Sequence, residues 1–106
     1  MSKKMKAVVM EGFGSADVLH LGMVERPVPD DNQVLIQVAA TSVNRPDIVQ
    51  REGNYPPPPG ESDVLGLEIA GTVIELGKSV SDWHLGDRVV ALVGGGGYAQ
   101  FAIAYS

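Results

Sequence analysis

Residues 44–55 read NRPDIVQREGNY, and this stretch decides how the rest of the chain is interpreted. Asn44 is a typical N-terminal cap of a helix, and Pro46 is tolerated in a first helical turn. The stretch therefore predicts one short helix that ends at the glycine near its end. The apolar residues 48–49 are expected to face the core, and the polar residues 50–52 are expected to face outward.

The segments on both sides of this helix have the patterns of β-strands. Residues 33–43 alternate between a wholly apolar face and a mixed face, which makes them the clearest strand. The remaining apolar runs predict strands at residues 6–10, 18–24, 88–93 and 98–105, and one long strand or a strand pair at residues 64–77. Thirteen glycines and seven prolines cluster between these runs, including a stiff proline spacer at residues 56–60. This pattern is typical of an all-β barrel or sandwich.

The glycine run at residues 94–97 satisfies the spacing G-x-G-x-x-G/A together with Ala99. In a dinucleotide-binding unit this spacing opens a helix whose N-terminus holds the pyrophosphate. Here residues 100–106 follow, and they alternate like a strand. We therefore interpret the glycine run as a tight hairpin turn, and the chain as lacking a complete nucleotide-binding unit.

The composition argues against several classes of protein. The chain has 106 residues, the length of one domain, and carries a net charge of −5 without a basic stripe, so nucleic acid is not an expected partner. No apolar run approaches the roughly 18 residues of a membrane span, and we expect a cytoplasmic protein without a membrane partner. There is no cysteine, and His20 and His84 are isolated, so no metal site is expected.

Three polar side chains near the predicted helix are the candidate site residues. Asn44, Arg51 and Tyr55 offer an amide, a guanidinium and a phenol, which together could orient a polar planar ligand. None of them can carry two electrons, so redox chemistry would need a cofactor. A purely structural alternative is that Asn44 caps the helix, Arg51 is solvated and Tyr55 packs beneath the prolines.

Four motifs occur in one order along the chain: NRPD with REGNY, LGLEIAGTV, GDRV and GGGYA. In order and spacing they resemble the zinc-free quinone oxidoreductases, the zeta-crystallin and p53-inducible quinone reductase group of the medium-chain dehydrogenase/reductase superfamily. The resemblance covers residues 5–106. It implies a mainly β fold over residues 1–106, a GroES-like β-barrel with one or two short helices. It also implies a following Rossmann domain that binds NADPH, which this chain lacks.

The departures from the zinc-dependent branch of that superfamily are specific. Asn44 stands where that branch has a zinc-ligand cysteine, Leu67 stands where it has a ligand histidine, and Pro46 replaces a hydroxyl of its proton relay. An amide and a leucine cannot hold zinc, whose sites are built from thiolate, imidazole or carboxylate. Glu68 is kept from the motif and is expected to make a structural hydrogen bond.

The resemblance therefore implies an NADPH-dependent enzyme that transfers hydride to quinones or activated enones without zinc. Asn44 and Tyr55 are the implied catalytic residues, with Asn44 at the nicotinamide and Tyr55 and Arg51 at the substrate. The whole enzyme is expected to be a homodimer or homotetramer, and the 106 residues alone are expected to be inactive. Two alternatives remain open here: an enoyl-thioester reductase of the same superfamily, and a non-enzymatic β-barrel interaction module.

Overall fold

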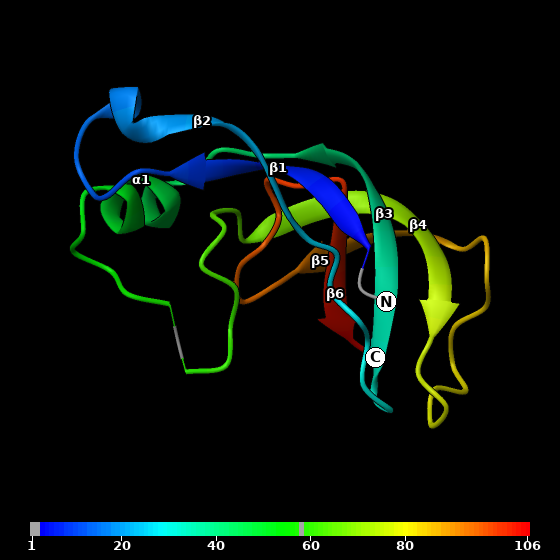
Figure 1. The fold of residues 1–106 in the computed structure, drawn as a ribbon. Helices are drawn as coiled ribbons and strands as arrows, with labels where there is room; N and C mark the ends of the chain where they lie inside the picture. The colour runs from blue at the N-terminus through cyan, green and yellow to red at the C-terminus, as the bar shows by residue number, and fades with distance from the viewer. Residues whose placement is uncertain (1–2, 58) are drawn as a thin grey trace.

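The computed structural model describes residues 3–57 and 59–106, so Pro58 of the predicted proline spacer lies outside the described residues. β-Strands dominate the chain (Figure 1). In chain order the elements are β1 (Lys4–Met10), the 3-10 helix η1 (Ala16–Val18), β2 (Leu19–Glu25), β3 (Gln33–Thr41), α1 (Arg45–Arg51), β4 (Glu68–Leu76), β5 (Arg88–Leu92) and β6 (Phe101–Tyr105). The mainly β fold class with short helices is confirmed, and residues 64–77 hold one strand, β4.

The strands form two antiparallel sheets. β1 pairs with β2, and the larger sheet has the order β5-β4-β3-β6. In the described part of the chain these sheets do not close into one barrel. They are joined by a bridge between Ala7 and Ala99, beside which the Val8 amide donates to the carbonyl oxygen of Tyr98 at 2.8 Å. The closed barrel of the sequence prediction is therefore an open pair of sheets.

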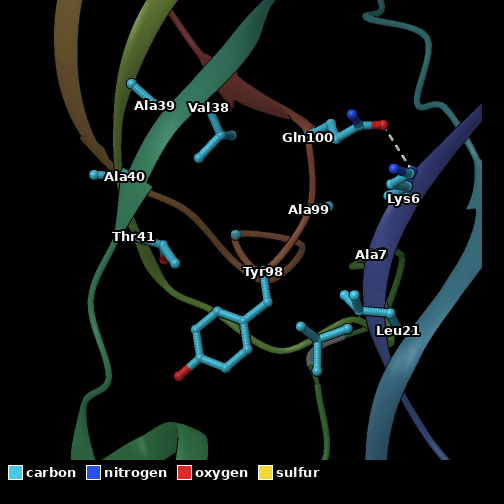
Figure 2. A pocket seen from close by; sticks show the side chains of 12 residues that line it. Lys6, Ala7, Leu21, Val38, Ala39, Ala40, Thr41, Tyr98, Ala99 and Gln100 are labelled. Carbon is cyan, nitrogen blue, oxygen red and sulfur yellow. Dashed lines mark hydrogen bonds between the residues drawn. The ribbon is translucent and has the colours of Figure 1, made fainter.

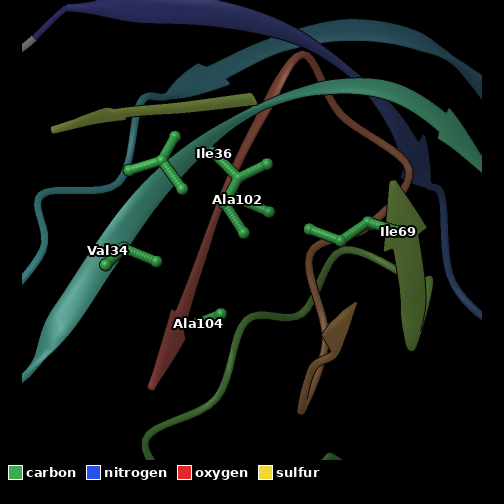
Figure 3. Packing of buried hydrophobic residues seen from close by; sticks show 6 residues of the cluster. Val34, Ile36, Ile69, Ala102 and Ala104 are labelled. Atoms are coloured by element: carbon green, nitrogen blue, oxygen red, sulfur yellow. The ribbon is translucent and has the colours of Figure 1, made fainter. Parts of the chain in front are cut away.

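The core lies on one face of the larger sheet (Figure 3). Because side chains alternate along a strand, residues two apart point to the same face. The core contains pairs of residues two or four positions apart from β3, β4 and β6: Val34 and Ile36, Ile69 and Val73, Ala102 and Ala104. The β3–β6 register places the small alanines of β6 opposite the branched residues of β3, so these side chains pack without crowding. Leu35, on the other face of β3, is also fully buried, so this part of β3 is covered on both sides.

The interpretation of the glycine run as a hairpin turn is wrong. β5 and β6 lie at opposite edges of the larger sheet, and residues 94–97 cross between them. The amides of Gly96, Gly97 and Tyr98 donate to the carbonyl oxygens of Val64, Gly66 and Leu65 at 2.7–3.0 Å. A β-carbon on Gly66 would lie 2.7 Å from the Tyr98 nitrogen, so glycine is needed where the two segments meet. Sequence alone cannot distinguish such a crossing from a turn, because both need small residues.

Candidate functional site

The buried face of α1 is polar, which contradicts the predicted orientation. Asp47 and Gln50 are 2% and 3% exposed, whereas the apolar residues 48–49 are half-buried. Residues three apart in a helix lie on the same face, and here that face turns inward. The prediction was wrong because it assumed that polar side chains stay in water unless a partner is close in the sequence.

Asn44 connects the start of α1 to the larger sheet. Its Nδ2 group donates to Ser42 Oγ at 3.1 Å and to Glu68 Oε1 at 3.3 Å, and Ser42 Oγ donates to the same Glu68 oxygen at 2.6 Å. Ser42 follows β3 and Glu68 begins β4, and the antiparallel pairing of these strands brings the two residues together. The expected structural hydrogen bond of Glu68 is confirmed.

These hydrogen bonds stabilise the negative charge of Glu68. The Ser42 hydroxyl, and after it the Asn44 amide, stabilise the carboxylate and hold the pKa of Glu68 below its ordinary value. Glu68 is therefore ionised at neutral pH, where it orients the Asn44 amide and cannot donate a proton. Leu67 precedes it, and its carbonyl oxygen accepts a hydrogen bond from the Val93 amide at 2.7 Å.

Sequence reasoning missed the pairing of the buried Asp47 with the half-buried Tyr98. Asp47 Oδ2 accepts hydrogen bonds from the Asn44 backbone amide at 3.0 Å and from the Tyr98 hydroxyl at 2.7 Å. Figure 2 shows the Tyr98 hydroxyl directed toward α1. Burial, followed by the hydrogen bond and charge of Asp47, raises the pKa of Tyr98 far above its ordinary value, so the phenol stays neutral. An acidic residue in a first helical turn was the available signal, but its partner lies 51 positions away.

Arg51 fastens the last turn of α1 to the loop that follows β1. Its Nε donates to the Gly14 carbonyl oxygen at 2.9 Å, and the Gly14 amide donates back to the Arg51 carbonyl at 3.0 Å. The Arg51 side chain is 19% exposed. The alternative of a solvated Arg51 is therefore wrong, and a role in substrate binding stays a prediction.

Tyr55 lies at the opposite end of α1 from Asn44. It is 42% exposed and lines a cleft of about 300 Å³ together with Phe13, Gln50, Pro56 and Asp63. Asn44 does not line this cleft. The three predicted site residues thus do not converge on one pocket: Asn44 joins Ser42 and Glu68, Arg51 joins Gly14, and Tyr55 joins the cleft.

A second hollow, of about 380 Å³, lies between the two sheets (Figure 2). Its walls come from β1, β2, β3 and residues 97–100, and they are mainly apolar, with the ring of Tyr98 among them. Within residues 3–57 and 59–106, no group of three histidine, cysteine or acidic side chains is placed to hold a metal ion. Over the same residues, no helix is long and apolar enough to cross a membrane.

The chain is similar over most of its length to known oxidoreductases. The family model described as alcohol dehydrogenase GroES-like domain matches residues 30–105. Quinone oxidoreductase of Sus scrofa is 40% identical in an alignment of 104 residues, which covers 96% of this chain and 32% of the relative.

Two solved structures have the same fold. The human synaptic vesicle membrane protein VAT-1 homolog-like protein superposes with a TM-score of 0.88 at 37% identity, covering 97% of this chain and 33% of that one. Escherichia coli quinone oxidoreductase complexed with NADPH superposes with a TM-score of 0.84 at 31% identity, covering 94% of this chain and 31% of that one. The chain spans 24% to 32% of the length of curated relatives that it matches.

Proposed function

Because the chain belongs to the family of alcohol dehydrogenase GroES-like domains, we propose that it is the substrate-side domain of an NADPH-dependent quinone oxidoreductase. The enzyme would transfer hydride from NADPH to quinones or activated enones without zinc. Support comes from the similarity to quinone oxidoreductases and from the arrangement around Asn44. We extend the proposal to a cytoplasmic homodimer or homotetramer, and to Tyr55 and Arg51 as substrate contacts.

The observation that carries the proposal is the orientation of the Asn44 amide. Both hydrogens of Nδ2 face acceptors, Ser42 Oγ and the ionised Glu68. The oxygen Oδ1 is then the atom of this side chain that can accept a hydrogen bond from the amide group of a nicotinamide. Asn44 would thus hold the nicotinamide ring by one amide–amide contact, while NADPH supplies the hydride.

The same residues do not fit a zinc ion. The Asn44 amide and the Leu67 side chain are not zinc ligands, and the Glu68 carboxylate is already engaged by two hydrogen bonds. Without a Lewis acid, the domain must act by placing an acceptor that takes hydride easily. Quinones and activated enones meet that requirement.

The test is to measure turnover by the full-length protein that carries this domain, through the decrease in NADPH absorbance. We expect a higher kcat/KM with a naphthoquinone than with crotonyl-CoA, and no loss of rate after dialysis against a zinc chelator. Preference for crotonyl-CoA would instead indicate an enoyl-thioester reductase. Inactivation by the chelator would contradict the zinc-free mechanism.

Variants of the full-length protein then test the two residues. Asn44→Ala should raise the KM for NADPH, whereas Tyr55→Phe should lower the rate only if its hydroxyl contacts the substrate. Tyr105→Phe is the matched control, because Tyr105 is 70% exposed on β6. The 106 residues alone should show no turnover, and sub-micromolar binding of NADPH to them would contradict that expectation.

A further inference from the structure

The cleft at the C-terminal end of α1 has the size and lining of a small-molecule site. Its volume is about 300 Å³, and its walls include the rings of Phe13, Tyr55 and Pro56. The Phe13 ring lies directly against Gly53, where a β-carbon would come within 3.0 Å of the ring. Gly53 also has a φ of +92°, so the wall depends on a glycine at this position. Apolar walls with a few polar groups are typical of ligand pockets.

Gln50 places an unsatisfied amide at this cleft. The residue is 3% exposed, and its side chain makes no hydrogen bond to any residue in the described ranges. In those ranges, Asp47 Oδ1 is the side-chain polar atom that is both fully buried and without a partner. The Gln50 amide also lacks a partner but is not fully buried, so it keeps a small exposed area. Gln50 is also one of the residues that line the cleft.

An amide in such a position is unfavourable for the free chain. Burying a polar group without a partner costs stability, which a ligand that completes the hydrogen bond would recover. An amide can donate to a carbonyl oxygen and accept from a hydroxyl. The position therefore suits a ligand with carbonyl or hydroxyl groups on its edge.

The charges around the cleft favour a neutral ligand. Asp63 is the ionisable acid in the lining, and no lysine, arginine or histidine belongs to the lining among the described residues. The neighbouring Arg51 donates a hydrogen bond to the Gly14 carbonyl oxygen, and its Nη2 lies 3.8 Å from Glu52 Oε2. An anionic ligand would meet the Asp63 carboxylate without a compensating cation.

We propose that this cleft binds a neutral, flat quinone and that the Gln50 amide donates a hydrogen bond to one of its carbonyl oxygens. The ring would lie against Tyr55 and Phe13, so Gln50 is a specificity-determining residue at the cleft. The class of ligand rests on the proposed function, whereas the cleft and its amide are properties of the chain itself.

The experiment titrates the chain with duroquinone, a fully methylated quinone with no free position for addition of lysine. Backbone amide NMR signals report where it binds, and we expect shifts at Gln50, Gly53 and Tyr55. Gln50→Leu should weaken binding by about 5- to 10-fold, the loss of one neutral hydrogen bond. Gln50→Glu should also weaken binding, because an ionised carboxylate cannot donate a hydrogen bond to the quinone carbonyl. Gln37→Leu, at an exposed position of β3, is the matched control and should bind like the unchanged chain.

Three outcomes would overturn the proposal: no binding of duroquinone, equal affinity of the Gln50→Leu variant, or shifts confined to the hollow between the sheets. None of these touches the proposed function, which is decided by turnover of the full-length protein. Conversely, binding that depends on Gln50 without quinone turnover would support this site and refute the oxidoreductase.

Discussion

Replacing Tyr98 by phenylalanine should destabilise the chain by about 2 kcal/mol. The change removes one hydroxyl, which donates at 2.7 Å to a carboxylate that is 2% exposed. A hydrogen bond to a charged group contributes about 1.5–3 kcal/mol. Within the described ranges Asp47 Oδ1 already lacks a partner, so after the change the Asn44 amide would be the remaining donor there to this carboxylate. For a domain of this size the melting temperature should fall by about 8–16 °C.

The loss should depend on pH in a defined direction. The native pKa of Tyr98 is raised, so the contribution of the phenol is fully present below the pKa of an unfolded tyrosine, about 10. As pH rises above that value, the unfolded chain releases the proton while the native chain keeps it, and the stability of the native state falls. The Tyr98→Phe variant has no phenol at this position, so its stability lacks this pH dependence. The difference in the free energy of unfolding between the two chains should therefore shrink at alkaline pH.

The assay is urea unfolding followed by circular dichroism, at neutral pH and above pH 10. Tyr105→Phe is the control, because Tyr105 is 70% exposed and its loss should change the free energy of unfolding by less than about 0.5 kcal/mol. A Tyr98→Phe variant as stable as this control would show that the hydrogen bond from Tyr98 to Asp47 does not stabilise the chain. A difference that grows with pH would contradict the expected pH dependence, because it would reverse its sign.

Three further changes test other parts of the structure. Gly71→Ala puts a β-carbon onto the Gln37 carbonyl oxygen in the β3–β4 ladder and should cost about 3 kcal/mol or more in urea unfolding; a cost below 1 kcal/mol would contradict this close approach. Ser42→Ala removes the main hydrogen bond that lowers the pKa of Glu68, so this pKa should rise in an NMR titration. The unchanged chain should lose stability as the pH falls through the lowered pKa, and the variant should lose less. An unchanged pKa would assign the effect to Asn44. Gln50→Leu removes a buried amide that has no partner among the described residues and should raise the free energy of unfolding by about 1 kcal/mol; a loss of stability would show that this amide makes a stabilising hydrogen bond.

Local patterns predicted most of the elements. The alternation from residue 33 predicts a strand that the structure ends at Thr41, and the cap and proline at residues 44–46 predict the start of α1. Both signals act over a few residues, where backbone sterics and side-chain periodicity decide the outcome. The family motifs predicted the GroES-like domain in the same way, because they are read in order along the chain.

The candidate site could be predicted only in part. Asn44 was predicted as a site residue, and Glu68 was expected to make a structural hydrogen bond, which it accepts from Asn44. Asp47 and Gln50 were missed, because a polar residue is assigned to the solvent unless its environment is known. That environment comes from Tyr98 and Phe13, which are distant in sequence.

Local sequence patterns predicted the strands and the position of the helix, because both depend on residues that are neighbours in the chain. The tertiary structure decided which strands pair, which face of α1 is buried and which candidate residues share a cleft. The glycine run shows why: small residues permit both a turn and a close crossing of two backbones, and the carbonyls of Val64, Leu65 and Gly66 select the crossing. Such selection depends on contacts between distant segments, so the separation of Asn44 from Tyr55 emerges only when the chain is folded.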